Sequence, residues 1–297
     1  MSRAHLSRRS LLRTGLAVSA TGVLLGGTRS ALAEPAQSVQ RELRALEREH
    51  DARLGVHATN TRTGATVTYR AHERFPMCST FKTLAAAAIV RDHDILDKRI
   101  RYTDEVLVPG SPITEQHVGA GMRVDDLCAA AICYSDNTAA NLLLHELGGP
   151  RAITRFCRSI GDPVTRLDRW EIELNTAFPG DPRDTTTPDA IGRDYRRLVL
   201  GDALRAGDRA QLTSWLRANT TSTNRFVAGL PKHWTIGDKT GSGDYGTTND
   251  VGIAWTGAGT PIVLATLSTK FEQDADYDDL LIADAARILA RTLAPGE

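Results

Sequence analysis

A serine and a lysine, Ser79 and Lys82, have the side chains and the spacing that acyl transfer requires. They begin a predicted helix over residues 79–91, in which a separation of three places both side chains on one face. A serine hydroxyl is a weak nucleophile until a base removes its proton, and a neutral lysine amine can act as that base. Backbone N–H groups at a helix start can also stabilise an oxyanion. The alternative interpretation is a helix-capping serine beside a solvated lysine.

Two other motifs combine hydroxyl groups with an amide or a cation. Ser135-Asp136-Asn137 lies between two apolar predicted helices, where its ordinary role would be a helix N-cap. The segment 239–243, Lys-Thr-Gly-Ser-Gly, follows a predicted strand and could bind a carboxylate and a carbonyl oxygen at an open strand edge. It could equally be an edge strand that its lysine protects from further pairing. Neither motif indicates a function by itself.

A fourth motif lies in the longest irregular stretch of the sequence, residues 162–187. It reads Arg-Trp-Glu-Ile-Glu-Leu-Asn over residues 169–175, and its Glu171 and Asn175 could together hold one water molecule. A carboxylate that activates a water beside an ester carbonyl would release an acyl group from a serine. Long loops in compact domains are usually functional. The alternative interpretation is a solvated acidic loop.

In their order along the chain, these motifs resemble those of the class A serine β-lactamases, which belong to the penicillin-recognising serine hydrolases. The pattern is S-x-x-K, S-D-N, R-x-E-x-x-L-N and K-T-G, and the resemblance extends over residues 38–293. Arg169 and Asp184 match the pair that bridges the ends of the loop in this family. The resemblance implies hydrolysis of the β-lactam amide of penicillins and cephalosporins through an acyl-serine intermediate, which would give antibiotic resistance.

Two alternatives stay open beside this interpretation. One is a D-alanyl-D-alanine peptidase or transpeptidase of related fold, which should lack the glutamate motif at Glu171. The other is a β-lactam receptor that is acylated once and stays acylated, and it would have little need for Glu171 and Asn175. Counting the product molecules formed per protein molecule separates both alternatives from a β-lactamase.

The resemblance implies five catalytic residues. Ser79 would attack the lactam carbonyl, and either Lys82 or Glu171, acting through a water, would take its proton. Ser135 would pass a proton to the departing lactam nitrogen. Glu171 and Asn175 would then activate the hydrolytic water.

Further residues are implied to bind the substrate. The backbone N–H groups of Ser79 and Ser242 would form the oxyanion hole. Asn137 would hold the substrate's side-chain amide, and the lysine motif would face its carboxylate. Arg225 matches a position at which some members support that carboxylate, although a surface ion pair is the alternative there. The implied substrate-binding set is Asn137, Lys239, Thr240, Gly241, Ser242 and Arg225.

Three positions depart from the family pattern. Ile172 follows the catalytic glutamate where many members have a proline, often with a cis bond. Gly110 stands where an aromatic residue often flanks the site. Cys128 matches one half of a disulfide found in some members, but its partner position is Ala86, so we predict that Cys128 forms no such bridge.

The elements that must position these residues change in type along the chain. A helix over about 38–53 and two strands, 54–60 and 65–70, precede a long helical block. Three strand-like segments and a last helix, about 278–293, follow it. We therefore expect a mixed α/β fold in which helices flank an antiparallel sheet built from both chain ends. The helices of the block are expected at 79–91, 124–134, 137–147, 151–160, about 187–200 and about 210–219, and the late strands at 234–239, 251–256 and 262–268.

The predicted domains follow from this order of elements. Residues 34–74 and 217–297 would form the α/β domain, and residues 75–216 an inserted all-helical domain that carries the nucleophile and the Glu171 loop. Residues 1–33 contain five arginines, no acidic residue, an arginine pair and an apolar run, and they are typical of an export signal of the twin-arginine type. We expect cleavage after Ala33 and a secreted or extracytoplasmic mature chain without stable membrane association.

Composition narrows the classes of function that remain. The chain has 297 residues, of which 41% are hydrophobic and 24% charged, and these fractions exclude a disordered or fibrous protein. After the signal, 31 basic residues face 36 acidic ones without a basic stripe, so nucleic acid is not an expected partner. Scattered histidines and cysteines imply no metal, and we expect no cofactor and a monomer.

Overall fold

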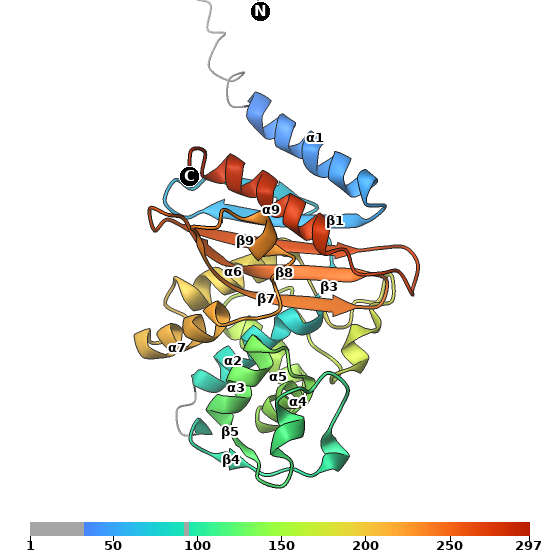
Figure 1. The fold of residues 1–297 in the computed structure, drawn as a ribbon, viewed down its shortest axis with the longest axis vertical. Coiled ribbons are helices and arrows are strands. Elements are labelled where there is room, and N and C mark those ends of the chain that lie inside the picture. Colours follow the sequence, from blue (N-terminus) through green and yellow to red (C-terminus); the bar gives the residue numbers. More distant parts are fainter. Residues whose placement is uncertain (1–32, 92–94) are drawn as a thin grey trace, which may run out of the picture.

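Five strands form one antiparallel sheet in the computed structural model, which describes residues 33–91 and 95–297 (Figure 1). The strand order is β2-β1-β9-β8-β7, so the two N-terminal strands join the three C-terminal ones through the pairing of β1 with β9. The predicted mixed α/β fold, with a sheet built from both chain ends, is confirmed. The strands are β1 (Arg53–Asn60), β2 (Thr66–Tyr69), β7 (Thr235–Gly243), β8 (Thr247–Trp255) and β9 (Pro261–Thr269).

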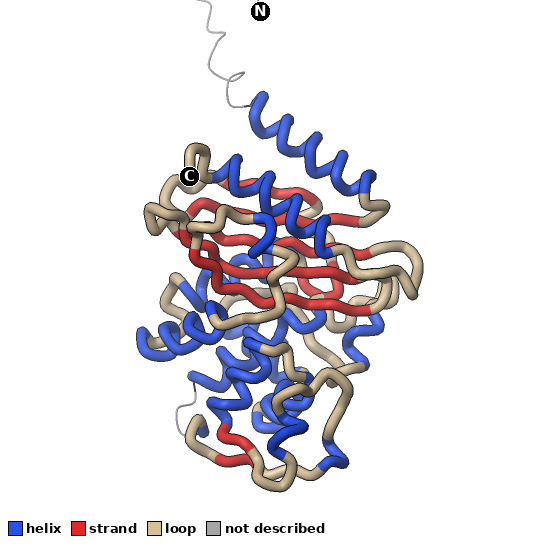
Figure 2. The backbone as a smooth tube through the Cα atoms, viewed as in Figure 1, coloured by secondary structure: helices blue, strands red, loops and turns tan. Residues whose placement is uncertain are grey.

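Helices cover both faces of the sheet (Figure 2). Helices α1 and α9 pack on one face together with the short α8, and α6 and α7 pack on the other, beyond which the remaining helices extend (Figure 1). The two faces of the sheet contribute to different apolar clusters, because successive side chains of a strand point to opposite faces. Val56 of β1 packs with α1 and α9, whereas Val263 of β9 packs with the helical block. The helices are α1 (Ala33–Glu49), α2 (Phe81–Val90), α3 (Val124–Cys133), α4 (Asn137–Glu146), α5 (Arg151–Ser159), α6 (Pro188–Val199), α7 (Ala206–Arg217), α8 (Phe226–Gly229) and α9 (Asp279–Leu293).

Short elements join these parts near the nucleophile. The 3₁₀ turn η1 (Cys78–Thr80) leads into α2, and η5 (Glu173–Thr176) lies in the long loop. Two small antiparallel pairs, β3 with β6 and β4 with β5, hold the flanking segments together. The remaining short elements are β3 (Phe75–Pro76), β4 (Arg99–Ile100), β5 (Met122–Arg123), β6 (Thr185–Thr186), η3 (Asp104–Val106) and η4 (Thr114–His117).

The caps predicted from the sequence explain where two helices begin. Asp136 precedes α4, and its side chain accepts a hydrogen bond from the N–H of Ala139 at 2.8 Å. Thr187 precedes α6 and accepts from the N–H of Ala190 at 3.2 Å, with Pro188 at the first helical position. Each cap satisfies a backbone donor that the first turn of a helix would otherwise leave unpaired.

Several boundaries were predicted wrongly: β8 begins at Thr247 and not at 251, α1 ends at Glu49 and not at about 53, and the strand that carries the lysine motif was predicted too short. The sequence indicated a strand over 234–239 followed by a glycine-rich turn, whereas β7 continues through the motif to Gly243 and pairs with β8 along its whole length. The two glycines of the motif allow other segments of the backbone to approach β7 closely. A Cβ on Gly241 would lie 2.8 Å from the carbonyl oxygen of Met77, and one on Gly243 would lie 2.6 Å from that of Asn175.

Two predictions about the chain as a whole are not tested by this fold. The division into an α/β domain and a helical domain stays a prediction. The export signal falls on residues 1–33, of which 1–32 lie outside the described residues. Among the helices that are described, none is both long enough and apolar enough to cross a membrane.

The four cysteines are buried free thiols, and Cys128 forms no disulfide, as predicted from Ala86 at its partner position.

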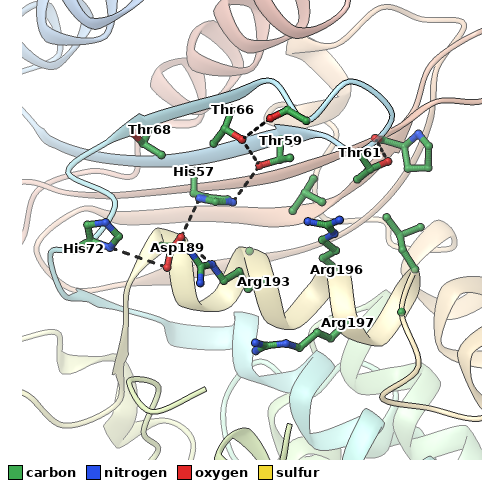
Figure 3. A pocket seen from close by; sticks show the side chains of 16 residues that line it. His57, Thr59, Thr61, Thr66, Thr68, His72, Asp189, Arg193, Arg196 and Arg197 are labelled. Carbon is green, nitrogen blue, oxygen red and sulfur yellow. Dashed lines mark hydrogen bonds and ion pairs between the residues drawn. The ribbon is translucent and has the colours of Figure 1, made fainter. Parts of the chain in front are cut away.

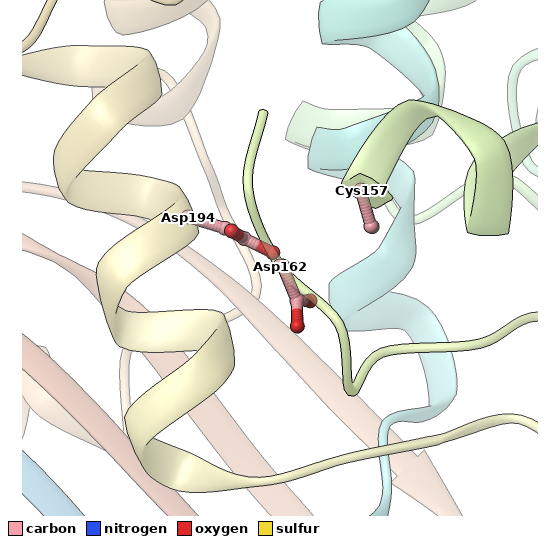
Figure 4. A group of neighbouring side chains, drawn as sticks. All are labelled: Cys157, Asp162 and Asp194. Atoms are coloured by element: carbon pink, nitrogen blue, oxygen red, sulfur yellow. The ribbon is translucent and has the colours of Figure 1, made fainter. Parts of the chain in front are cut away.

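Cys157 lies beside two carboxyl groups, Asp162 and Asp194, and ligand-type atoms of the three lie within 4.8 Å of one another (Figure 4). Burial raises the pKa of the Cys157 thiol above its usual range. Burial, and then the neighbouring Asp162, raise the pKa of Asp194 to about 9. The raised pKa values of Cys157 and Asp194 favour the protonated forms of both groups at neutral pH.

We expect the Asp194→Asn variant to lose part of the pH dependence of stability. Because the pKa of Asp194 is raised in the folded protein, its contribution is fully present below about pH 4 and is lost as the pH rises toward about 9. In that interval the group lowers the free energy of unfolding by about 1.4 kcal/mol per pH unit. Unfolding temperatures of wild type and variant between pH 5 and 9 should diverge accordingly, with the exposed Asp202→Asn as control. An equally steep decline in Asp194→Asn would contradict this assignment.

Candidate active site

Ser79, Lys82 and Glu171 meet at the start of α2. The Ser79 Oγ lies 3.4 Å from the Glu171 Oε1, and the Lys82 Nζ lies 3.0 Å from the same oxygen. The side chains of Lys82 and Glu171 are both fully buried. Burial lowers the pKa of Lys82, while the Glu171 carboxylate acts in the opposite sense. Two groups that can accept a proton thus lie next to a hydroxyl group, which is the arrangement that an activated serine nucleophile needs.

The Ser-Asp-Asn motif combines a structural role with a place in the site. Lys82 Nζ donates to the carbonyl oxygen of Ser135 at 2.8 Å and to the Asn137 Oδ1 at 2.6 Å, and it lies 3.4 Å from the Ser135 Oγ. Asp136, between them, is buried; besides capping α4 it accepts the N–H and the hydroxyl of Thr114. Asp136 thereby holds the turn that directs Ser135 and Asn137 toward Lys82. The capping interpretation is confirmed for Asp136, and the chemical interpretation of Ser135 and Asn137 stays a prediction.

The long loop carries Glu171 into the site. Asn175 donates from its Nδ2 to the Glu171 Oε2 at 2.6 Å, and the peptide bond between Glu171 and Ile172 is cis. Asn141 of α4 grips the Glu171 backbone, donating to its carbonyl oxygen and accepting from its N–H, both at 2.9 Å. Sequence reasoning missed Asn141. Its position four residues after Asn137, on the same helix face, was the signal that could have found it.

The ends of this loop are closed by the predicted pair. Arg169 donates from its Nε to the Asp184 carboxylate at 2.5 Å, which confirms that these two residues bridge the loop. Asp184 also accepts the backbone N–H groups of Asp168 and Arg169, and a second nitrogen of Arg169 donates to the Thr176 hydroxyl. Because Asp184 is buried, these bonds hold the two ends of the loop firmly together.

Strand β7 places the lysine motif along the opposite wall. Lys239 is fully buried, and burial together with the charge of Lys82 lowers its pKa to about 7. Its Nζ donates to the carbonyl oxygen of Thr240 at 3.0 Å, and the Thr240 hydroxyl lies 2.5 Å from that of Thr221. Since β7 is an edge strand, its outer side is free to meet a ligand.

Arg225 is a buried brace for this strand and not a surface ion pair. Its guanidinium donates to the carbonyl oxygens of Gly241 and Asn249, on β7 and β8, at 2.9 and 2.8 Å. It also donates to the Ser242 Oγ at 2.7 Å and pairs with Asp279 at 2.7 Å. Arg225 therefore holds the rim on which Ser242 lies and brings a positive charge to it.

These parts surround one cavity of about 990 Å³. Eight of the residues proposed from the sequence line it, and the other three, Lys82, Glu171 and Lys239, are buried in its floor and walls. Two exposed tyrosines, Tyr134 and Tyr277, also line the cavity and were not expected. The eight predicted lining residues are Ser79, Ser135, Asn137, Asn175, Arg225, Thr240, Gly241 and Ser242.

Comparisons with known proteins agree with this geometry. The model of the beta-lactamase enzyme family matches residues 38–293. A beta-lactamase of Streptomyces lavendulae is 55% identical over 98% of both chains. The solved beta-lactamase of Streptomyces albus G is 58% identical with a TM-score of 0.85, over 86% of this chain and all of that one. A class A beta-lactamase of the last common ancestor of Gram-negative bacteria is 55% identical with a TM-score of 0.82, over 85% of this chain and 98% of that one. The chain belongs to the beta-lactamase enzyme family, and within it to class A.

Proposed function

We propose that this protein hydrolyses the β-lactam amide of penicillins and cephalosporins through an ester on Ser79, and that it thereby gives antibiotic resistance. The observation that carries the proposal is the position of Glu171, 3.4 Å from the Ser79 Oγ and hydrogen-bonded to Asn175. A carboxylate there can serve both the nucleophile and the water that later removes the acyl group. Membership of the beta-lactamase family, and the beta-lactamase names of close relatives, support the same reaction.

Acylation begins when the Ser79 hydroxyl loses its proton to the Glu171 and Lys82 pair. The Ser79 Oγ attacks the lactam carbonyl, and the backbone N–H groups of Ser79 and Ser242 stabilise the resulting oxyanion. As the C–N bond breaks, the nitrogen takes a proton from Ser135, which Lys82 replenishes. The contacts of Lys82 with Glu171, at 3.0 Å, and with the Ser135 Oγ, at 3.4 Å, support this route. The products of the step are a serine ester and a free amine on one ring-opened molecule.

In deacylation, a water molecule removes the acyl group from Ser79. Glu171 and Asn175 hold a water between them, Glu171 takes its proton, and the hydroxide attacks the ester carbonyl. The ester bond breaks, the Ser79 Oγ regains a proton, and the ring-opened acid leaves. During both steps Asn137 holds the side-chain amide of the substrate, and Arg225 with the lysine motif on β7 holds its carboxylate. The positions of these residues around one cavity support those roles.

Counting product molecules per protein molecule tests the proposal. Mature protein with excess benzylpenicillin and with a chromogenic cephalosporin should give many turnovers of each. A single equivalent, with the mass of the drug retained on the protein, would indicate a receptor or a peptidase instead. Release of D-alanine from a peptide ending in D-alanyl-D-alanine, without β-lactam turnover, would indicate the peptidase. The Glu171 loop disfavours both alternatives, because a receptor keeps its acyl group and a peptidase of related fold is expected to lack this loop motif.

We expect a falling limb near pH 7 in the profile of kcat/KM for benzylpenicillin. The pKa of Lys239 is lowered to about 7, so the free enzyme loses this positive charge as the pH rises and binds the substrate carboxylate less well. The methyl ester of benzylpenicillin lacks that carboxylate and should not show the limb. Profiles of both substrates from pH 5.5 to 9 make the comparison. The same limb for the ester would assign the titration to another group, such as Lys82.

Three further features belong to the proposal. We propose that residues 1–33 direct export, that the mature protein works outside the cytoplasm without membrane attachment, and that it is a monomer without a cofactor. The arginine pair and the apolar run support the first.

We also propose that residues 34–74 and 217–297 form one domain and residues 75–216 a second one. The position of the site, between α2 and α4 on one side and β7 on the other, supports that division.

A further inference from the structure

A second cavity, of about 970 Å³, lies between α6 and the strands β1 and β2 (Figure 3). Because β2 and β7 are the two outer strands of the sheet, this groove is at the edge opposite the active site. His57 and Thr59 of β1 line it, and their partners on β2 are Thr68 and Thr66. Side chains alternate along a strand, so these four polar groups share the face that looks toward α6.

The wall formed by α6 is positively charged. Asp189, Arg193, Arg196 and Arg197 line the groove, so its lining carries a formal charge of +2 with neutral histidines. Arg193 pairs with Asp189 at 3.0 Å, and Arg197 lies 3.4 Å from Asp194 outside the groove. Arg196 points from α6 toward the strands, and within residues 33–91 and 95–297 it has no ion-pair partner (Figure 3). An unpaired guanidinium facing a row of hydroxyl groups is an arrangement suited to an anion.

His57 is a built part of this groove and not a chance surface residue. It is only 7% exposed, and its ring packs on α6 at Gly192, where a Cβ would lie 2.9 Å from the ring. A glycine inside a helix is costly, and here it makes room for the imidazole. The Nδ1 has no hydrogen-bond partner and lies 3.3 Å from the Asp189 carboxylate, while the Nε2 lies 3.3 Å from the Thr59 hydroxyl.

We propose that the groove between α6 and β1–β2 binds a phosphate-class oxyanion, either inorganic phosphate or a phosphate monoester, through Arg196, Arg193 and the threonine hydroxyls, with His57 beneath. A tetrahedral dianion can accept hydrogen bonds from both walls at once, the guanidinium groups on one side and the hydroxyl groups on the other. The volume leaves room for the organic part of a monoester. This site stands apart from β-lactam hydrolysis and does not depend on it.

Binding of a tetrahedral anion whose own charge stays constant should strengthen as the pH falls. Burial lowers the pKa of His57; Asp189 acts in the opposite sense, and Arg193, His72 and Arg196 lower the pKa further. The lining residues from β9 are apolar and add no charge. An anion in the groove favours the imidazolium form, so binding and protonation of His57 promote each other.

Titration calorimetry with inorganic phosphate on the mature protein, at constant ionic strength, tests the site. We expect binding that Arg196→Gln weakens about tenfold or more, since a charged hydrogen bond is lost. Arg205→Gln removes the same charge from an exposed position outside the groove and should leave the affinity within about twofold. The Arg196 side chain has no ion-pair or hydrogen-bond partner in the part of the chain that the structure describes, so its variant should unfold at the wild-type temperature.

Two further measurements decide between ligand classes and test the histidine. At pH 8, where both are dianions, succinate should bind much more weakly than phosphate, and equal binding would overturn the phosphate class. The affinity for sulfate, a tetrahedral oxyanion whose charge stays constant in this range, should rise between pH 8 and pH 5.5, and His57→Gln should remove that rise. No measurable binding of phosphate, or equal losses in Arg196→Gln and Arg205→Gln, would overturn the proposal.

Discussion

Replacing Ser79 by alanine is expected to remove covalent labelling by penicillin and to lower kcat/KM by about 10⁴-fold or more, because no ester can form without the Oγ. The change removes one hydroxyl whose contact, with Glu171, is 3.4 Å long. Lys82 and Glu171 keep their ion pair of 3.0 Å, so we expect the variant to fold as the wild type does.

Mass spectrometry after brief exposure to benzylpenicillin provides the measurement. Wild type quenched early should carry the mass of the intact drug, and Ser79→Ala should carry none. Ser214→Ala is the matched control, since that exposed serine on α7 hydrogen-bonds only within its own helix. A drug adduct on Ser79→Ala, or turnover near that of wild type, would show that another residue is the nucleophile.

The elements of the fold follow from local patterns to a large extent. Predicted helices at 137–147 and about 187–200 correspond to α4 and α6, because Asp136 and Thr187 cap them with side chains that the sequence displays. Strand β7 was predicted too short, since Gly241 and Gly243 are typical of turns in a sequence alone. These positions are glycines because η1 and the long loop approach β7 closely there, which only tertiary structure reveals.

The candidate site likewise has residues that the sequence motifs indicated and residues that sequence reasoning missed. The resemblance of the motifs to those of the family implied that Ser79 and Glu171 would meet, and the Ser79 Oγ lies 3.4 Å from the Glu171 Oε1. Asn141 was missed because it acts through the backbone of a residue 30 positions away. The burial of Arg225 was missed because its partners come from β8 and α9. The spacing of Asn141 from Asn137 indicates a shared helix face but does not identify the distant partner, and such long-range contacts hold the site in shape.

Replacing Glu171 by glutamine is expected to separate the two halves of the reaction. Glutamine keeps the size of the side chain but cannot take a proton from water, so deacylation should slow by about 10²–10⁴-fold. Lys82 loses its carboxylate partner, and the burial that lowers its pKa then meets less opposition, chiefly from Asp136. More of the amine is neutral as a result, and a neutral Lys82 can still activate Ser79. The acyl-enzyme should therefore form and accumulate.

A burst of one equivalent of product, followed by slow turnover, would be the kinetic sign, and the drug's mass on Ser79 the chemical one. Glu49→Gln is the control, because this exposed acid on α1 lies outside the active-site cavity. Its turnover should equal that of wild type. Steady turnover at the wild-type rate in Glu171→Gln would remove Glu171 from deacylation. The burst rate also identifies the acylation base: a burst as fast as in wild type assigns that step to Lys82, because glutamine cannot perform it, whereas a burst slowed as much as deacylation assigns it to Glu171.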